Sequence, residues 1–415
     1  MADTIVTADV IAKIALPILD NELGALSTLH RAHESEFGQT VNGYKKGGSV
    51  SINRPADFTV TDGATRSNQD IIEGKVTLSV DQQKHVSFSL TSEQMTLDME
   101  NLATRVVKPA VINIVNEVAR DTFDQFYKGV YNWAGTPGQV VNSYADFSKA
   151  VERLDEMAVM QNDRHAVMSP ADYHAMVGSN VSLFVQDAAR SALRMAQLGS
   201  IGGLNTWMTQ VTPTHTNGTP DNTTPLVDGA AQNVTYDAAK NTYSQTLVTD
   251  GWDPEGATLT AGTVFTIAGV NMVNPKTKAD TGILQQFVVT ADTVTNAAAA
   301  NDTNIVISPP IITSGPHQTV SAVPADDAVI VLAGAASTGY KQNLAYHRNA
   351  MALAVVPLEM PQGNVDAARR TKNGLSLRVV SDYDIDNDLS VWRLDILYGR
   401  KLIDPRLATR FSGTA

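Results

Sequence analysis

Four aspartates near the C-terminal end of the chain alternate with other residues, and carboxylates are ligands that calcium prefers. They are Asp382, Asp384, Asp386 and Asp388. A calcium loop of the EF-hand type also needs glycine at its sixth position and an acidic residue at its twelfth, where this chain has Asn387 and Arg393. Alternate residues of a strand share one face, so we interpret the aspartates as an acidic edge that faces solvent or a partner.

Two other groupings could bind a metal or attack a substrate. His30 and His33 lie one helical turn apart with Glu34 beside them, a spacing that can bind zinc, but no third ligand is specified and a polar helix face explains them better. Ser169 precedes Pro170, which is the favoured arrangement at a helix start, so a cap explains this serine. We therefore predict no catalytic residue, no cofactor and no metal site.

The composition narrows the function further. The 415 residues contain none of the phosphate-binding, dinucleotide-binding, zinc-protease or serine-hydrolase motifs. Cysteine is absent, which excludes disulfides, thiolate metal sites and a cysteine nucleophile. The net charge of −12 argues against nucleic-acid binding by the whole surface, and suits a surface that faces DNA without adhering to it. With no signal peptide and no membrane span expected, we predict a soluble structural protein made in a cytoplasm, not an enzyme.

The longest predicted element is a helix from about residue 98 to residue 131. At about 1.5 Å per residue it would be roughly 50 Å long, so it predicts a beam across which the rest of the chain packs. Pro109 lies inside the pattern and should bend this beam. The apolar residues that define the pattern recur mostly three to five positions apart: Leu102, Val106, Val111, Ile114, Val118, Phe126 and Val130.

Two segments precede this helix. Residues 4–36 show an amphipathic helical pattern, which predicts an N-terminal arm docked on its own domain or on a partner. Residues 49–90 alternate with a period of two, which predicts strands, and the polar tract 57–74 with its Asp62-Gly63 turn is typical of a long hairpin tip. The hairpin either packs against another molecule or forms a solvated loop on a larger sheet, and the local sequence leaves both open.

The second half of the chain combines helical and strand patterns. Helices are predicted over 144–157 and after Ser169, strands over 166–168 and 204–208, and a hinge at Gly199–Gly203. No arginine occurs between Arg194 and Arg348, and strand-like runs there predict an inserted β-barrel or sandwich of about 120 residues, with linkers at 213–225 and 334–339. The runs are 232–236, 245–248, 263–270, 284–290, 304–308 and 329–332. Strands at 375–380 and 389–398 and a basic segment, 399–411, close the chain.

This order of parts resembles the major capsid (coat) proteins of tailed double-stranded DNA phages, which have the Hong Kong 97-type fold. Two stretches carry a narrower resemblance to the branch with an extra inserted β-barrel domain. Residues 261–278, AGTVFTIAGVNMVNPKTK, are similar to the barrel core of that branch, and residues 397–411, LYGRKLIDPRLATRF, are similar to its closing segment. The resemblance implies an α+β fold with a long spine helix, an extended β-hairpin called the E-loop, and an inserted all-β barrel domain.

The resemblance also implies a division of the chain into domains. Residues 1–40 would be the N-terminal arm and residues 41–95 the E-loop, which overlies a neighbouring subunit. The peripheral domain with the spine helix would comprise 96–165 and 365–415. The axial domain would comprise 166–215 and 342–364, and residues 216–341 would be the insertion domain.

The function implied is self-assembly, with a scaffolding protein, into hexamers and pentamers of an icosahedral procapsid that encloses double-stranded DNA. Further expected partners are the portal protein, packaged DNA through non-specific contacts, and a decoration protein, with no membrane. The location would be the virion, after assembly in the host bacterial cytoplasm. The shell would be non-covalent, because no lysine–asparagine cross-linking motif can be assigned. Two alternatives are an encapsulin-like compartment protein, disfavoured by the barrel, and a β-rich adhesin, disfavoured by the spine helix and the polar hairpin.

Two sets of residues are predicted to serve this assembly. Hexamers and pentamers of one chain require rigid parts joined by bendable ones. The candidate hinges are Pro109, Gly47, Gly48, Gly199, Gly202 and Gly203. The candidate inter-subunit contacts are Asp62, Arg66, Asp237, Lys240, Arg400 and Arg406; Asp237 and Lys240 are the only charges in the tract that matches the branch's two-fold-bridging loop.

Overall fold

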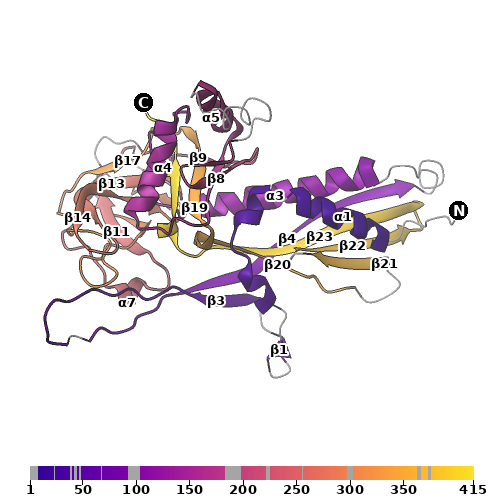
Figure 1. Cartoon of the computed structure of the whole chain (residues 1–415), viewed down its shortest axis with the longest axis horizontal. Coiled ribbons are helices and arrows are strands. Elements are labelled where there is room, and N and C mark those ends of the chain that lie inside the picture. The colour runs from indigo at the N-terminus through magenta and orange to yellow at the C-terminus, as the bar shows by residue number, and fades with distance from the viewer. Residues whose placement is uncertain are drawn as a thin grey trace. The chain divides into compact units, whose positions relative to one another are not determined.

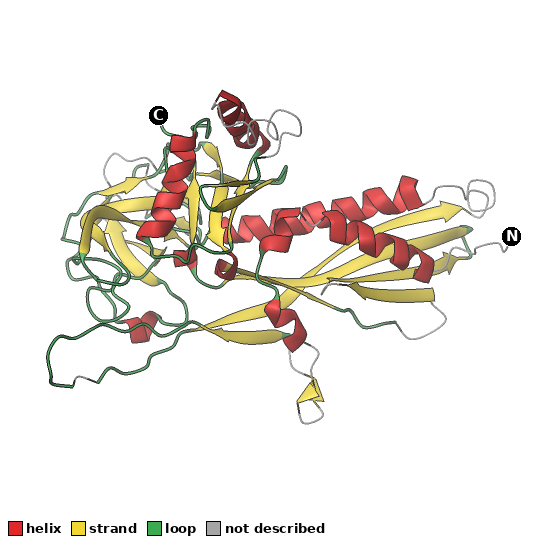
Figure 2. Ribbon diagram, in the orientation of Figure 1, coloured by secondary structure: helices red, strands yellow, loops and turns green. Residues whose placement is uncertain are grey.

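The computed structural model describes residues 8–415 except for 23, 38–39, 42–43, 46–47, 67, 92–102, 183–197, 221–224, 255, 297–301, 362–365 and 373–374. The architecture is α+β, as predicted (Figure 2). The chain divides into two compact units, which we describe separately. Unit 1 comprises 1–51, 77–122 and 351–401, and unit 2 comprises 52–76, 123–350 and 402–415.

Unit 1 contains a six-stranded sheet. In spatial order its strands are β21 (Asp366–Lys372), β22 (Leu375–Asp384), β23 (Leu389–Leu402), β4 (Lys75–Thr91) and β3 (Ser49–Asn53), with β20 (Met351–Val356) also paired to β23. β4 is one continuous strand of 17 residues that pairs with β23 from Thr91 to Val80. The predicted hairpin strands are therefore part of the chain's own larger sheet, which was one of the two alternatives.

The long helix is present and ends earlier than predicted; its predicted start lies outside the described residues. α3 spans Lys108–Tyr127, and the residues before 103 lie outside the described part of the chain. It ends four residues early because Gly129 and Val130 close the last turn with 3.1 Å hydrogen bonds, after which Val130 and Tyr131 are buried in extended chain. The helical spacing nevertheless identified the buried face, which includes Val111, Ile114 and Val118.

Pro109 does not lie in the interior of a regular helix. It is the second residue of α3, where a missing N–H costs little, and a π-helical turn at Ala103–Val107 comes directly before it. The proline ring clashes with the carbonyl four residues earlier in an ordinary α-helical turn, and the wider turn avoids that clash. The expected irregularity is thus a change of helical type at the start of the helix.

The N-terminal arm is docked on its own chain. α1 (Ala8–Glu22) packs against β21 and β22 (Figure 1). Asp9 forms an ion pair with Arg370 of β21, and the backbone N of Ala8 donates to Asp366 Oδ2 at 2.9 Å. Two 3₁₀ turns, Gly24–Thr28 and Ala32–Glu36, follow within the predicted arm, and β1 (Thr40–Val41) pairs with β2 (Tyr44–Lys45).

A buried carboxylate organises the middle of the unit 1 sheet. Asp395 of β23 is fully buried and accepts hydrogen bonds from Arg378 at 2.7 Å and Arg393 at 2.7 Å. Burial alone would raise the pKa of Asp395, but the hydrogen bonds from Arg378 and Arg393 outweigh it and hold that pKa below its usual value. An acid with a lowered pKa stabilises the fold at neutral pH.

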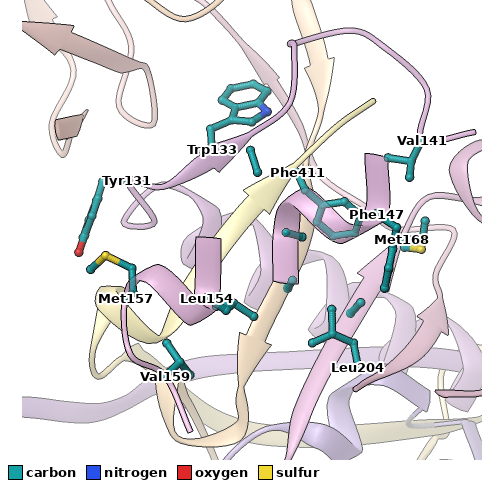
Figure 3. Packing of buried hydrophobic residues seen from close by; sticks show 14 of the residues in the cluster. Tyr131, Trp133, Val141, Phe147, Leu154, Met157, Val159, Met168, Leu204 and Phe411 are labelled. Atoms are coloured by element: carbon teal, nitrogen blue, oxygen red, sulfur yellow. The ribbon is translucent and has the colours of Figure 1, made fainter. Parts of the chain in front are cut away.

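Unit 2 contains a second six-stranded sheet. Its order is β5 (Trp133–Ala134), β24 (Ala408–Phe411), β19 (Asn343–His347), β6 (Arg164–Met168), β8 (Leu204–Met208) and β7 (Ser200–Ile201). The helices α4 (Tyr144–Glu156) and α5 (Pro170–Ser182) belong to the same unit. Phe147 and Leu154 of α4 pack with Met168, Leu204 and Phe411 in one core (Figure 3).

Two helices of unit 2 begin with a serine cap, of which Ser169 was predicted from the sequence. Ser143 Oγ accepts from the backbone N of Asp146 at 3.1 Å and begins α4. Ser169 Oγ accepts from the backbone N of Asp172 at 3.2 Å and begins α5. Ser169 Oγ also donates to Asp172 Oδ2 at 2.5 Å, so the cap accounts for this hydroxyl.

Residues 216–341 of unit 2, which we call the insertion region, form a separate antiparallel sheet. The chain enters and leaves through β9 (Thr214–Thr216) and β18 (Gly339–Lys341), which pair with each other and form what we call the neck. The sheet order is β10 (Leu226–Val227), β11 (Gln245–Asp250), β16 (Thr303–Ser308), β14 (Asp280–Val289), β13 (Val264–Val273) and β17 (Ile330–Leu332).

The sheet of the insertion region closes on itself. The backbone N of Val227 donates to Ala328 O at 3.0 Å, and the backbone N of Ile330 donates to Pro225 O at 2.9 Å, which joins the two ends of the strand order. The interior is apolar and includes Trp252, Phe265, Phe287, Ile305 and Ile330. Two further short strands, β12 (Thr258–Leu259) and β15 (Thr293–Val294), pair with each other.

The sequence located five of the six predicted strands of this region. The run 232–236 was wrong: it is irregular up to Thr235, where the short helix α7 (Tyr236–Ala239) begins. The predicted linkers 213–225 and 334–339 also contain structure, because β9 lies in the first and β18 begins at the end of the second.

We expect Asp395→Asn to lower the free energy of unfolding of unit 1 by about 3 kcal/mol at pH 7, because two arginines lose a buried carboxylate. The wild-type contribution is present above about pH 4 and is lost as the pH falls through the lowered pKa, so the two proteins should converge in acid. Urea unfolding at several pH values measures this. The exposed control Asp386→Asn should change stability by less than about 0.5 kcal/mol; an equally small effect at Asp395 would contradict the expectation.

Candidate assembly surface

The exposed loop of residues 54–74 is the part of unit 2 with the most solvent-exposed apolar side chains. It connects β3 to β4 without regular structure (Figure 1, indigo). Phe58 is 53 % exposed, Val60 96 % and Ile71 71 %. Apolar side chains clustered on one exposed segment mark a surface that another molecule covers.

The loop is tied to itself by one glutamine. Gln69 Oε1 accepts from the backbone N of Thr59 at 2.9 Å, and Gln69 Nε2 donates to Thr59 O at 2.5 Å. Nearer the strands, Asn53 Nδ2 donates to Glu73 Oε2 at 3.3 Å. These bonds hold the two sides of the loop together where no strand ladder does so. Asp62 and Arg66, two predicted inter-subunit contacts, lie exposed beyond Thr59.

The root of the loop is anchored by a buried arginine. Arg54 Nε donates to Ile403 O at 2.9 Å, Arg54 Nη1 donates to Lys240 O at 3.3 Å, and the guanidinium lies 5.0 Å from the centre of the Tyr243 ring. Burial lowers the pKa of Arg54, and nearby Asp404 opposes that shift. The root therefore joins the insertion region to the segment that ends the chain.

The other side of the root touches the same part of the insertion region. A Cβ added to Gly74 would lie 2.2 Å from Lys240 O, so only glycine permits this approach. The next residue, Lys75, donates its backbone N to Asn241 Oδ1 at 3.0 Å. Near the start of the loop, Asp57 Oδ2 lies 3.5 Å from Lys278 Nζ of the insertion region. Residues 236–243 and Lys278 therefore contact both ends of the loop.

Four predicted inter-subunit residues are paired inside the chain. Lys240 Nζ lies 2.6 Å from Asp237 Oδ1, one turn apart at α7. Arg400 Nη2 lies 2.8 Å from Asp121 Oδ1 of α3, within unit 1. A charge held by a carboxylate of its own chain is a weaker partner for a neighbour, so Asp62 and Arg66 remain the more accessible candidates.

Arg406, the remaining member of that set, belongs to a buried pair. Its guanidinium binds Asp404 in a bidentate manner, with Nε to Oδ1 at 3.0 Å and Nη2 to Oδ2 at 2.8 Å. Burial would raise the pKa of Asp404, but Arg406 and then Arg54 outweigh it and keep that pKa below its usual value. The pair therefore stays ionised near the root of the exposed loop.

The candidate hinges occupy different kinds of turn. Gly202 and Gly203 have φ of +57° and +79° and form the two-residue turn between Ile201 and Leu204 in the β7–β8 hairpin, with Gly199 at +66° just before it. Gly48 lies at the start of β3, where its O accepts from the backbone N of Val80 at 2.8 Å. Gly47 lies outside the described residues. Their role as hinges stays a prediction.

The acidic residues of segment 382–388 lie at the end of β22 (Asp382 and Asp384) and in the turn that joins β22 to β23 (Asp386 and Asp388). Asp384 Oδ1 accepts from the backbone N of Asp386 at 3.1 Å, and Asp384 Oδ2 accepts from Asn387 Nδ2 at 2.7 Å. Tyr383 donates its hydroxyl to Asp388 Oδ1 at 2.6 Å. These bonds within the turn account for the acidic pattern without a cation.

The described residues do not bring together a metal-binding cluster. Among them, no group of three or more histidine, aspartate or glutamate side chains is arranged to hold a metal ion. His33 Nδ1 lies 2.7 Å from Glu36 Oε1, which gives this histidine a partner on its own turn. No helix in the described ranges is both long and apolar enough to cross a membrane.

Sequence reasoning missed the anchors Arg54, Gly74 and Asp404. Arg54 and Gly74 flank the polar tract 57–74, and Asp404 lies two residues before Arg406. That spacing was the only local signal, because the carbonyls of Lys240 and Ile403, which Arg54 binds, lie far away in the sequence.

We expect Gly74→Ala to release the root of the loop, because the added methyl group cannot share space with Lys240 O. Amide hydrogen exchange of the soluble subunit should become at least tenfold faster in residues 54–74 and 236–245. Gly48→Ala is the matched control, since its Cβ would meet only Val80 O at 3.8 Å. Unchanged exchange in the Gly74→Ala variant would show that the contacts with residues 236–243 do not hold the loop.

Comparisons with known proteins agree with a role in assembly. The family described as "P22 coat protein - gene protein 5" matches residues 39–413. The major capsid protein of Acyrthosiphon pisum secondary endosymbiont phage 1 is 24% identical over 382 residues, 88% of this chain and 89% of the relative.

Two solved structures are also similar to the chain. One is from Mycobacterium phage Che8, with 12% identity, coverage of 93% of this chain and 89% of that chain, and a TM-score of 0.48. The other is the capsid of Ralstonia phage GP4, with 10% identity, 93% and 86% coverage, and a TM-score of 0.42. The family match covers most of the sequence and carries the assignment. The chain therefore belongs to the P22 coat protein family and is a phage major capsid protein.

Proposed function

We propose that this capsid protein assembles, with a scaffolding protein, into the hexamers and pentamers of an icosahedral procapsid that encloses double-stranded DNA. In this proposal the subunit has the Hong Kong 97-type fold, and the exposed loop 54–74 lies on a neighbouring subunit. The observation that carries the proposal is the exposure of Phe58, Val60 and Ile71 on a loop whose root is firmly anchored. The encapsulin-like and adhesin alternatives are set aside because the family is one of phage coat proteins.

Burial of the loop can supply a large part of the contact energy. Complete burial of one large apolar side chain contributes about 1.5–3 kcal/mol, so three such side chains per subunit offer roughly 5–9 kcal/mol before the cost of ordering the loop. In a ring of subunits, each copy both gives and receives this contact. Such a repeated weak contact favours closed rings over free subunits, because each copy in a closed ring has two neighbours.

The insertion region supports the domain assignment made from the resemblance. Residues 216–341 have their own apolar interior and a closed sheet, and they connect to the rest of unit 2 through the paired strands of the neck. These properties are what an inserted barrel domain requires. We therefore assign 216–341 as the insertion domain and 54–74 as the outer part of the E-loop (41–95).

The remaining assignments follow the same proposal. Residues 1–40 form the arm, 96–165 with 365–415 the peripheral domain, and 166–215 with 342–364 the axial domain. Scaffolding protein, portal protein, packaged DNA and a decoration protein are the proposed partners beyond the subunit itself. The net charge of −12 favours weak, non-specific contact with DNA, because a shell interior that bound phosphates strongly would resist packaging.

We expect the triple variant Phe58→Ser, Val60→Ser, Ile71→Ser to remain a folded, soluble subunit but to form no shells. Its polar loop gains little from lying on a neighbour, while the buried core is unchanged. Co-expression with the scaffolding protein of the same phage, followed by electron microscopy, measures the outcome. The wild type should give uniform shells.

The control for this experiment is the double variant Val329→Ser, Val331→Ser, which removes exposed valines from β17 instead of the loop. It should assemble more completely than the triple variant. Uniform shells from the triple variant would refute the role of the loop. A wild-type protein that stays a soluble subunit with its scaffolding protein would refute the proposed assembly as a whole.

A further inference from the structure

Arg410 of β24 is buried in the interior of unit 2, and no acidic side chain of the described residues pairs with it. Its exposed fraction is 0 %, and it is one of the largest fully buried side chains. The guanidinium carbon lies 5.3 Å from the ring centre of Tyr127 and 5.6 Å from that of Trp133, so two aromatic rings contact it. Burial lowers the pKa of Arg410 to about 9, which still leaves it protonated at neutral pH.

Only part of the guanidinium is hydrogen-bonded. Arg410 Nη1 donates to Gly262 O at 2.7 Å and to Gln342 Oε1 at 3.3 Å. Arg410 Nε and Nη2 are buried and have no hydrogen-bond partner within the described residues. A buried cation with unmet donors costs free energy, since water would otherwise satisfy them.

Arg164 is a buried arginine of the same unit whose Nε and Nη2 both donate hydrogen bonds. It lies in β6 and is also buried. Its Nη2 donates to Asp155 Oδ1 at 2.6 Å and to Val159 O at 2.6 Å, and its Nε donates to Met160 O at 2.8 Å. The two residues have the same chemistry and similar burial, so the contrast isolates the missing partners of Arg410.

The two hydrogen bonds of Arg410 join the insertion region to the rest of unit 2. Gly262 belongs to the insertion region, Gln342 follows the neck strand β18, and Tyr127 ends α3. A Cβ on Gly262 would lie 2.9 Å from Tyr127 Cε2, so the insertion region is already in close contact with the helix end at this point. The neck residue His215 completes the group, with its Nδ1 3.4 Å from the Tyr127 hydroxyl.

We infer that Arg410 is a positioning residue that fixes the angle of the insertion region on the rest of unit 2, at a net cost in stability of the folded subunit. The bond to Gly262 O fixes the position of the insertion region, and the contacts with the rings of Tyr127 and Trp133 fix the direction of the arginine side chain. An unbranched apolar side chain of similar length would occupy the same space without a desolvated charge but could not bond to Gly262. This inference concerns the subunit itself and goes beyond the proposed assembly.

The first measurement compares Arg410→Met with Arg164→Met in urea unfolding of the soluble, full-length subunit. The midpoint of Arg410→Met should equal or exceed that of the wild type, because an unpaired cation is removed. The folding equilibrium constant of Arg164→Met should fall at least tenfold, because Asp155 and two carbonyls lose their donor.

The second measurement follows the angle directly. Because the chain has no cysteine, Glu152→Cys in α4 and Val294→Cys in β15 can be spin-labelled without other changes. Both positions are exposed and lie in unit 2, one on each side of the neck. Pulsed electron paramagnetic resonance should give one narrow distance distribution with Arg410 and a distribution at least twice as wide with Arg410→Met.

Two results would overturn the inference. If Arg410→Met fails to fold, or its midpoint falls as far as that of Arg164→Met, the guanidinium is an ordinary stabilising group. If Arg410→Met is as stable as the wild type and keeps a narrow distance distribution, the residue does not set the angle. Neither result depends on whether shells form, so failure of the proposed assembly is distinguished from failure of this inference.

Discussion

The last segment of the chain, residues 402–413, completes unit 2 by pairing on both sides. β24 lies between β19, which it pairs antiparallel, and β5, which it pairs parallel. Beyond it, the backbone N of Ser412 donates to Ala134 O at 3.0 Å and that of Gly413 to Gln139 O at 2.9 Å. A strand inside a sheet contributes hydrogen bonds and core residues to both neighbours, so the unit 2 sheet depends on β24.

The same segment contacts several other parts of unit 2. Ile403 O receives the Arg54 guanidinium at the root of the exposed loop, Asp404 and Arg406 form the buried pair beside it, and Arg410 reaches Gly262 in the insertion region. The sequence shows a basic segment here, and its charges suggested contacts with other subunits. In the structure two of its arginines interact within the chain: Arg406 pairs with Asp404, and Arg410 is fully buried.

The periodic parts of the fold could be predicted from the sequence, and the parts set by distant contacts could not. The apolar spacing of Val111, Ile114 and Val118 located α3, and the strands β11, β13 and β16 followed from their alternation. The alternation of 49–90 predicted strands but not that β4 runs unbroken through the polar residues 81–85, where β23 pairs with residues 82–85 before a register shift at Asp81. Two-residue strands such as β10 and β12 have no period to detect, and backbone pairing alone defines them.

The candidate site shows the same division. The exposed loop and its Asp62-Gly63 turn were visible in the local sequence. Arg400 was predicted to contact another subunit. Its pairing with Asp121 could not be predicted, because the two residues lie 279 positions apart and no local pattern connects them. Arg410 is the extreme case, since an arginine in a basic tail carries no signal that it will be enclosed by Tyr127 and Trp133.

The neck has a consequence for how such a subunit can vary. Thr216 and Gly339 are direct partners across β9 and β18, so the chain leaves the body and returns to it at neighbouring points. A module joined in this way can grow, shrink or be exchanged for a foreign one while the strands below keep their register. The length of residues 216–341 can therefore change while the pairing of β9 with β18 stays the same.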